Sequence, residues 1–152
     1  VPHIALRTSL IVGFPGETEE QFEGLLPFVQ ETRFESLGLF TYSPEEGTEA
    51  ARMPGQLPEE EKVRREGLIM EAQSPISDEI NLGRTGAVEE VLIEGKTDRA
   101  DFPFWGRTRF QAPEIDGITY VTGQNLQPGD LIRCRITGAA LYDLFADSRG
   151  QA

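Results

Sequence analysis

The sequence predicts two fold classes in one chain, an α/β unit followed by an all-β barrel of five strands. An apolar, β-branched run early in the chain enters a Gly-Pro-Gly turn and then a helical repeat, which is typical of an α/β unit. After residue 86, short apolar stretches alternate with glycine and proline turns, which is typical of a small OB-type barrel. A charged segment separates the two. We therefore expect three parts, residues 1–52, 53–86 and 87–152.

Residues 1–52 are predicted to form a strand, a helix and a second strand. The strands are expected at Leu6–Val12 and Ser36–Tyr42, with a helix from about Glu19 to Thr32 between them. Thr18 begins a Thr-Glu-Glu-Gln capping box, and Pro27 should kink or cut the helix because proline lacks the N–H. Such a βαβ unit pairs its strands in parallel. Because two apolar strands cannot cover themselves, we expect them to belong to a larger barrel.

Residues 53–86 form a predicted linker helix region. Pro58 suits the first helical turn, and Glu59–Glu61 suit the positive end of a helix dipole, an explanation we favour over a metal site. Pro75 should break the helix, since its ring clashes with the preceding turn. Val63, Gly67 and Met70 are expected to share one face of the helix, and its other residues are charged.

Residues 87–152 are predicted to form five strands of a closed or nearly closed barrel. Ile132, Cys134 and Ile136 alternate with polar residues, so Cys134 is expected to be a buried core residue rather than a redox or metal residue. Aromatic and basic residues cluster around Trp105; they would stack on a nucleic acid strand or fill the core. The strands are expected at Val88–Glu94, Phe104–Phe110, Ile118–Thr122, Leu131–Thr137 and Ala140–Phe145.

The chain is strongly acidic, with 14 Lys and Arg against 26 Asp and Glu and a net charge of -12. This charge disfavours RNA, whose phosphates need a basic surface, and favours a basic protein partner. Residues 86–152 follow the trend, with seven basic against ten acidic residues. No apolar run is long enough to span a membrane, and a single cysteine excludes an intramolecular disulfide. We therefore expect a cytoplasmic protein without a membrane partner.

The turn after the first strand is the candidate ligand site. A strand, a glycine turn and a helix N-terminus bring together backbone N–H groups and a positive dipole end, which suits an oxygen-rich ligand. Many βα turns have this form and bind nothing, so a purely structural turn is the alternative.

Four blocks of the sequence resemble the radical S-adenosylmethionine methylthiotransferases. The first is Ile11–Thr18, read as IVGFPGET, and the second is Leu39–Thr48, which contains YSPEEGT. Ala112–Gly117 and Tyr142–Leu144 are similar to the terminal domain of the RimO-type branch, which methylthiolates an aspartate of a small-subunit ribosomal protein. The resemblance implies the last βαβ unit of a partial TIM-like radical SAM barrel, followed by a TRAM domain.

The resemblance also implies cofactors, namely S-adenosylmethionine and two 4Fe-4S clusters in the parent enzyme. The clusters need a CxxxCxxC triad and three further cysteines, whereas this chain has only Cys134. Because the sequence also begins at Val1 rather than at a methionine, we expect it to be the C-terminal part of a larger enzyme. By itself it should be inactive, and it should bind none of these cofactors in full.

The resemblance further implies where the ligands bind. The glycines after the first strand would allow close backbone approach to S-adenosylmethionine, Phe14 would wall its adenine, and Glu17 would contact it or complement the helix dipole. The expected cofactor residues are Gly13, Phe14, Pro15, Gly16 and Glu17. The expected substrate residues, on the terminal barrel, are Trp105, Arg107, Arg109, Glu114 and Asp116.

Two other functions compete with this interpretation. A tRNA-adenosine methylthiotransferase would use the terminal barrel to bind RNA, and we would expect that barrel to be basic. A free-standing OB-like binding module would have no enzymatic parent. Whichever function is correct, the unpaired edges of the two-stranded unit also allow self-association.

Overall fold

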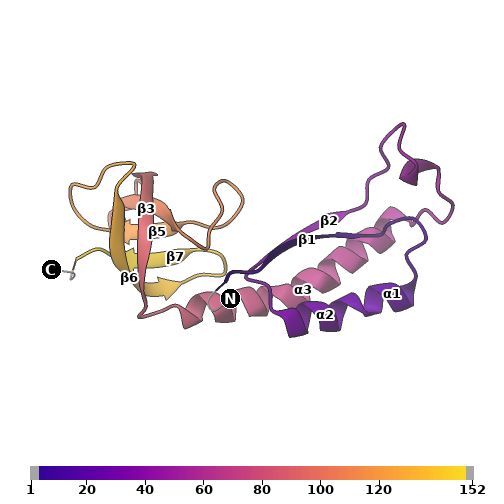
Figure 1. Cartoon of the computed structure of the whole chain (residues 1–152), viewed down its shortest axis with the longest axis horizontal. Coiled ribbons are helices and arrows are strands. Elements are labelled where there is room, and N and C mark those ends of the chain that lie inside the picture. The colour runs from indigo at the N-terminus through magenta and orange to yellow at the C-terminus, as the bar shows by residue number, and fades with distance from the viewer. Residues whose placement is uncertain (1–3, 150–152) are drawn as a thin grey trace. The chain divides into compact units, whose positions relative to one another are not determined.

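The computed structural model describes residues 4–149, which form two compact units that divide between Ile76 and Ser77 (Figure 1). The first unit is α/β, and the second is a closed β-barrel. The boundary falls inside helix α3 (Glu59–Gly83), so the segment expected to be a linker contributes to both units. No helix in the described part of the chain is long and apolar enough to cross a membrane.

The first unit is the expected βαβ arrangement. Strands β1 (Arg7–Val12) and β2 (Ser36–Thr41) pair in parallel along their whole length. Helices α1 (Glu19–Glu23) and α2 (Leu25–Thr32) connect them, and the 3-10 helix η1 (Ala50–Arg52) follows β2. The first and last residues of these strands, and of the helical segment between them, lie within about one residue of those expected from the hydrophobic pattern.

The helix between the strands is interrupted, as expected from Pro27, and the interruption lies at Gly24. The Thr18 capping box is present: Thr18 Oγ1 accepts from the Gln21 N–H at 3.2 Å, and Gln21 Oε1 accepts from the Thr18 N–H at 2.9 Å. Gly24 separates α1 from α2. Pro27 then lies in the first turn of α2, where its missing N–H costs no intrahelical bond.

The helices cover one face of the β1–β2 pair (Figure 1). Val12, Phe22 and Val29 are completely or almost completely buried there. On the other face Ile11 lies opposite Phe40 in the parallel register, and each side chain remains 57% exposed. The unit therefore leaves one apolar strand face open within the described residues.

Helix α3 runs unbroken from Glu59 to Gly83, so the predicted break at Pro75 is wrong. A proline in a helix interior costs about 3 kcal/mol, which packing can offset. Gln73 and Ile76 are buried on either side of Pro75, and Gln73 Nε2 donates to the Phe34 carbonyl at 2.8 Å. These contacts hold the helix through the proline.

The face of α3 that Val63, Gly67 and Met70 share is not its buried face. Val63 is 55% exposed, whereas Lys62, Arg65 and Ile69 are buried. The apolar pattern was misleading because two long cations place their aliphatic stems in the interior and pair their charged ends with acids and carbonyls.

The second unit is a closed barrel of five strands, as predicted, in the order β3-β4-β5-β7-β6. Its strands pair antiparallel, except that β5 and β7 are parallel. Closure removes the free strand edges. The strands are β3 (Val88–Lys96), β4 (Phe104–Thr108), β5 (Thr119–Thr122), β6 (Leu131–Ala139) and β7 (Leu144–Asp147).

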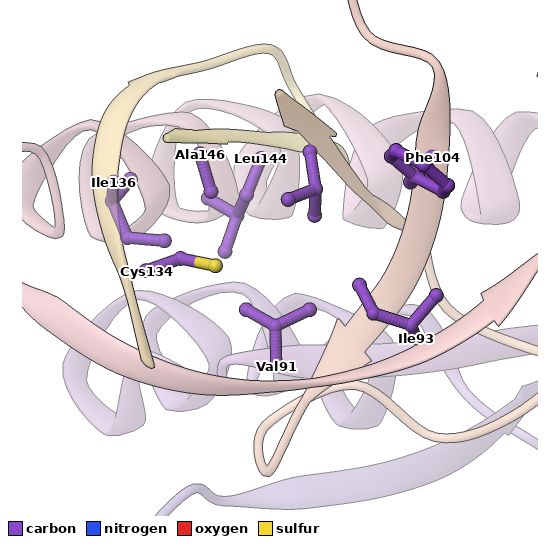
Figure 2. Packing of buried hydrophobic residues seen from close by; sticks show 8 residues of the cluster. Val91, Ile93, Phe104, Cys134, Ile136, Leu144 and Ala146 are labelled. Atoms are coloured by element: carbon purple, nitrogen blue, oxygen red, sulfur yellow. The ribbon is translucent and has the colours of Figure 1, made fainter. Parts of the chain in front are cut away.

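Side chains from all five strands fill the barrel interior (Figure 2). The core aromatic residue is Phe104, and neither Trp105 nor Phe110 is fully buried. Cys134 is completely buried and is a free thiol, which confirms its interpretation as a core residue. The core cluster consists of Val91, Ile93, Phe104, Val121, Cys134, Ile136, Leu144 and Ala146.

The last strand does not begin where the sequence predicted, at Ala140. Instead β6 continues to Ala139, and the Ala140 N–H donates to the Asp143 carbonyl at 2.8 Å across a turn that precedes β7. Gly138, read as a turn residue, lies in β6, where the pairing register with β7 shifts after Ile136. A glycine in a strand often marks such an irregularity rather than the end of the strand.

We expect the Cys134 thiol to resist alkylation in the folded protein. Burial, together with the charge of Asp147, raises the pKa of this thiol from 9.0 to about 11, and only the thiolate is nucleophilic. Iodoacetamide at mildly alkaline pH should leave the native protein unmodified and should add one equivalent after unfolding in urea. Modification of the native protein at the unfolded rate would show that the barrel interior is open.

Candidate functional site

The loop after β1 adopts a backbone conformation that requires its glycines. Gly13 has φ +76° and Gly16 has φ +83°, both in the left-handed region that disfavours other residues. The Glu17 N–H donates to the Phe14 carbonyl at 2.9 Å, and the Gly16 N–H donates to the Gly55 carbonyl at 2.9 Å. The turn is therefore defined by its own hydrogen bonds and by the segment that precedes α3.

Glu17 closes this loop through its side chain. Glu17 Oε1 accepts from the Gly13 N–H at 3.1 Å and forms a short ion pair with Arg65 Nη1. The Glu17 side chain is only 12% exposed. Its carboxylate thus joins the first and last residues of the Gly13–Glu17 loop and contacts α3.

Arg65 binds three glutamates from its buried position on α3. Its side chain is 4% exposed; Nε contacts Glu61 at 2.7 Å and Nη2 contacts Glu19 at 3.0 Å, in addition to the Glu17 pair. Arg64, on the exposed side, also contacts Glu19 and Glu61. Of these residues, only Glu17 is among the predicted site residues. The i,i+4 spacing of Glu61 and Arg65 was readable, but a pairing across 48 positions was not.

Lys62 packs against the loop at Gly13. Lys62 Nζ donates to the Tyr42 carbonyl at 2.8 Å and contacts Glu59 at 3.1 Å. The Phe14 and Tyr42 rings meet edge to face, with centroids 5.2 Å apart. The Tyr42 hydroxyl is buried and has no hydrogen-bond partner among the described residues, which leaves a polar atom beside the loop to be satisfied.

An open pocket of about 520 Å³ lies on the loop. It brings together four of the five expected cofactor residues, and the fifth, Gly13, lies beside Lys62 rather than in the lining. Ile11 and Phe14 contribute exposed apolar side chains to the lining, and Gly16 contributes a position without a Cβ. A flat apolar group with polar edges suits this surface. The lining residues are Ile11, Phe14, Pro15, Gly16, Glu17, Gln21 and Leu25.

The loop and the barrel contain no metal-binding constellation. Among residues 4–149, no group of three or more His, Cys, Asp and Glu side chains could hold a metal ion. Cys134, the one cysteine in the sequence, lies in the barrel core. The residues present therefore do not fit an iron–sulfur cluster, which needs several thiolates at fixed positions.

Two of the expected substrate residues, Trp105 and Arg107, lie on the outer face of β4. Trp105 packs over Gly95, where a Cβ would approach the indole to 2.4 Å, and Arg107 Nε pairs with Glu94 at 2.8 Å. Trp105 also lines an open pocket of about 380 Å³. None of the other residues of this pocket was predicted as a site residue; they are Lys96, Thr97, Arg99, Ile118 and Tyr120.

Arg107 does not line that pocket, and neither do the other three substrate candidates. The Arg109 side chain is 65% exposed, lies 3.9 Å from Glu89 and packs on the Phe110 ring. Glu114 is exposed and has φ +65°. Asp116 Oδ2 accepts from the Ala112 N–H at 2.6 Å, which stabilises the loop between β4 and β5. The structure therefore groups Trp105 with residues that were not predicted, and the substrate role of all five candidates stays a prediction.

The barrel belongs to a known class of domain: residues 85–148 match the TRAM domain family. Similarity then extends over nearly the whole chain to proteins named ribosomal protein uS12 methylthiotransferase RimO. Identity is 55% with that of Syntrophus aciditrophicus, 50% with that of Oleidesulfovibrio alaskensis and 51% with that of Pelotomaculum thermopropionicum. These alignments cover 97%, 95% and 97% of this chain and 33%, 34% and 34% of the relatives.

The chain thus spans about a third of the length of the curated relatives it matches. These similarities confirm the resemblance to RimO-type methylthiotransferases and the TRAM domain that the motifs predicted.

We expect Gly13→Ala to destabilise the first unit more than Gly47→Ala. Both glycines have positive φ, but a Cβ at Gly13 would lie 2.5 Å from Lys62 Cγ, whereas Gly47 has open space. Overpacking adds about 1–3 kcal/mol to the shared backbone strain. Urea unfolding of the two variants measures the difference. Equal losses would show that Lys62 does not constrain the loop.

We expect Glu61 to make the stability of the first unit depend on pH in the acid range. Hydrogen bonds from Arg64 and Arg65 lower the pKa of Glu61 from 4.5 to about 2. A lowered folded-state pKa contributes stability that is present above the unfolded value of 4.5 and is lost as the pH falls toward 2.

Thermal unfolding as a function of pH tests this expectation. Glu61→Gln should lower the melting temperature at neutral pH and should approach the wild type near pH 2. Glu60→Gln, at an exposed glutamate of the same first turn, is the matched control. Parallel pH curves for wild type and Glu61→Gln would contradict the role of Glu61.

Proposed function

We propose that this chain is the C-terminal part of a radical S-adenosylmethionine methylthiotransferase that modifies an aspartate of ribosomal protein uS12. The observation that carries the proposal is the identity of 50–55%, over at least 95% of this chain, with relatives named ribosomal protein uS12 methylthiotransferase. A ribosomal target would place the reaction in the cytoplasm.

The open strand face supports a place within a larger barrel. Ile11 and Phe40 present apolar side chains from two parallel strands whose other face is already covered. Parallel sheets are normally covered on both faces, and two strands are too few for independent stability. Further strands of the same barrel would pair the edges of β1 and β2 and would enclose this face within the barrel, where Ile11 also lines the pocket at the loop.

The chemistry of the clusters is assigned to other parts of the enzyme, because the residues of this chain do not fit them. The Gly13–Glu17 loop fits S-adenosylmethionine better. Phe14 and Ile11 offer apolar surface for an adenine ring, and the turn at Gly16 leaves space that a Cβ would otherwise enter. In this proposal the loop holds the nucleoside and contributes no reacting group.

The TRAM barrel is proposed to dock the protein substrate. Ribosomal proteins are typically basic, and their approach is favoured by the net charge of -12 of the whole chain, to which residues 86–152 contribute ten acidic against seven basic residues. The same charge works against RNA, which needs cations for its phosphates. The outward Trp105 and its pocket offer an aromatic contact of the kind that anchors protein interfaces.

Deletion of the gene in the source organism tests the function. We expect uS12 to lose a methylthio group, detected by mass spectrometry of the intact ribosomal protein, and to regain it with the full-length gene. A gene that lacks residues 87–152 should not restore it, because the substrate would no longer dock.

Three results would overturn parts of this proposal. Loss of a methylthioadenosine from tRNA, with uS12 unchanged, would establish the tRNA branch instead. No change in either molecule would support a binding module without an enzymatic parent. Full restoration by the gene without residues 87–152 would exclude the TRAM barrel from substrate docking.

A further inference from the structure

We infer that Arg65 of α3 is a positioning residue of the Gly13–Glu17 loop and that, through Glu17, it sets the affinity of the loop for S-adenosylmethionine. The inference rests on the proposed function for the identity of the ligand. The positioning itself follows from contacts within the first unit.

The Arg65 guanidinium is buried and is held in one orientation by its contacts. Its side chain is 4% exposed, and its guanidinium lies 5.1 Å from the centroid of the Phe22 ring. Nη1 donates to both the carboxylate and, at 3.2 Å, the backbone carbonyl of Glu17. A planar guanidinium can make these contacts at once, whereas an ammonium acts as a single point charge.

Glu17 connects Arg65 to the first residue of the Gly13–Glu17 loop. The Glu17 oxygen that pairs with Arg65 also accepts from the Gly13 N–H at 3.1 Å. Without Arg65, a carboxylate that is only 12% exposed would keep few partners and would favour solvent. The Gly13 N–H would then lose its acceptor, and both ends of the loop would be released together.

Release of the loop would weaken the binding of a ligand in the pocket that the loop lines. Gly13 and Gly16 hold positive φ values, and glycine is the residue with the most conformational freedom to lose. A loop already ordered by Arg65 pays less on binding, whereas a free loop must be ordered by the ligand. The lining of the 520 Å³ pocket includes Phe14 to Glu17, so the cost of ordering these residues on binding lowers the affinity of the pocket for its ligand.

Arg64 is the natural control for Arg65. It lies next in the same helix and contacts Glu19 at 2.7 Å and Glu61 at 2.6 Å, two of the three glutamates that Arg65 contacts. It has no recorded contact with Glu17, and its side chain is 44% exposed. Arg64→Gln therefore removes one positive charge from the same acid cluster without touching the loop.

The test compares Arg65→Gln with Arg64→Gln in the full-length protein. Hydrogen exchange measured by mass spectrometry on the peptide that contains Gly13–Glu17 reports the loop itself. Calorimetric titration with S-adenosylmethionine reports the affinity. We expect Arg65→Gln alone to accelerate exchange in the loop and to weaken binding about tenfold, because a hydrogen bond to a charged group contributes about that much.

A third variant keeps the test decisive if Arg65→Gln does not fold. Arg65→Lys retains the positive charge but cannot span the glutamates as a fork. We expect it to keep the circular dichroism spectrum of the wild type and still to show faster exchange in the loop. A folded Arg65→Lys protein with wild-type exchange and affinity would overturn the inference and leave Arg65 a purely structural residue.

The two readouts separate this inference from the proposed function. If the wild-type protein does not bind S-adenosylmethionine, the proposed function fails, while the exchange measurement still decides whether Arg65 positions the loop. If the wild type binds and Arg65→Gln binds equally well, the inference alone fails.

Discussion

The need to cover apolar strand faces and to pair strand edges shapes both units of this chain. The barrel meets both needs by closing five strands around a core that includes Val91, Phe104 and Leu144. The βαβ unit cannot close with two strands, so helices cover one face and leave Ile11 and Phe40 exposed on the other. The same constraint thus yields one unit that completes its own sheet and one that offers a sheet to be completed, by further strands or by a second copy.

Where α3 packs against the Gly13–Glu17 loop, the buried contacts are made by charged side chains rather than by apolar ones. Buried positions of α3 that an apolar pattern would assign to leucine or valine carry Lys62 and Arg65. Lys62 reaches the Tyr42 carbonyl, directly after β2, and Arg65 reaches the Glu17 carboxylate, at the end of the loop that follows β1. Ligand sites commonly lie at the carboxyl ends of parallel strands. A buried ion pair contributes little net stability, because desolvation opposes it, but it specifies one geometry, which is what a ligand loop needs.

Local patterns predicted most of the fold. Strand periodicity located β1, β2, β3 and β6, and the capping box and Pro27 explained the interrupted helix. The errors occurred where packing outweighed a local rule. Pro75 remains helical because buried neighbours hold both sides, and Gly138 remains in a strand because the register shifts there. Of the candidate site, the sequence identified the loop residues that line the pocket but placed Glu114 and Asp116 with Trp105, from which the structure separates them.

The sequence by itself determined the order of elements, the capped glycine turn, the burial of Cys134 and the resemblance to methylthiotransferases, because each depends on residues close together in the chain or on short motifs. Only the tertiary structure showed that Arg65 pairs with Glu17 and that Lys62 lies against Gly13. These contacts join residues nearly fifty positions apart, and no periodicity relates them. They exist because α3 packs against the βαβ unit, and that packing, rather than helix propensity, decides which cation is buried and which carboxylate it meets.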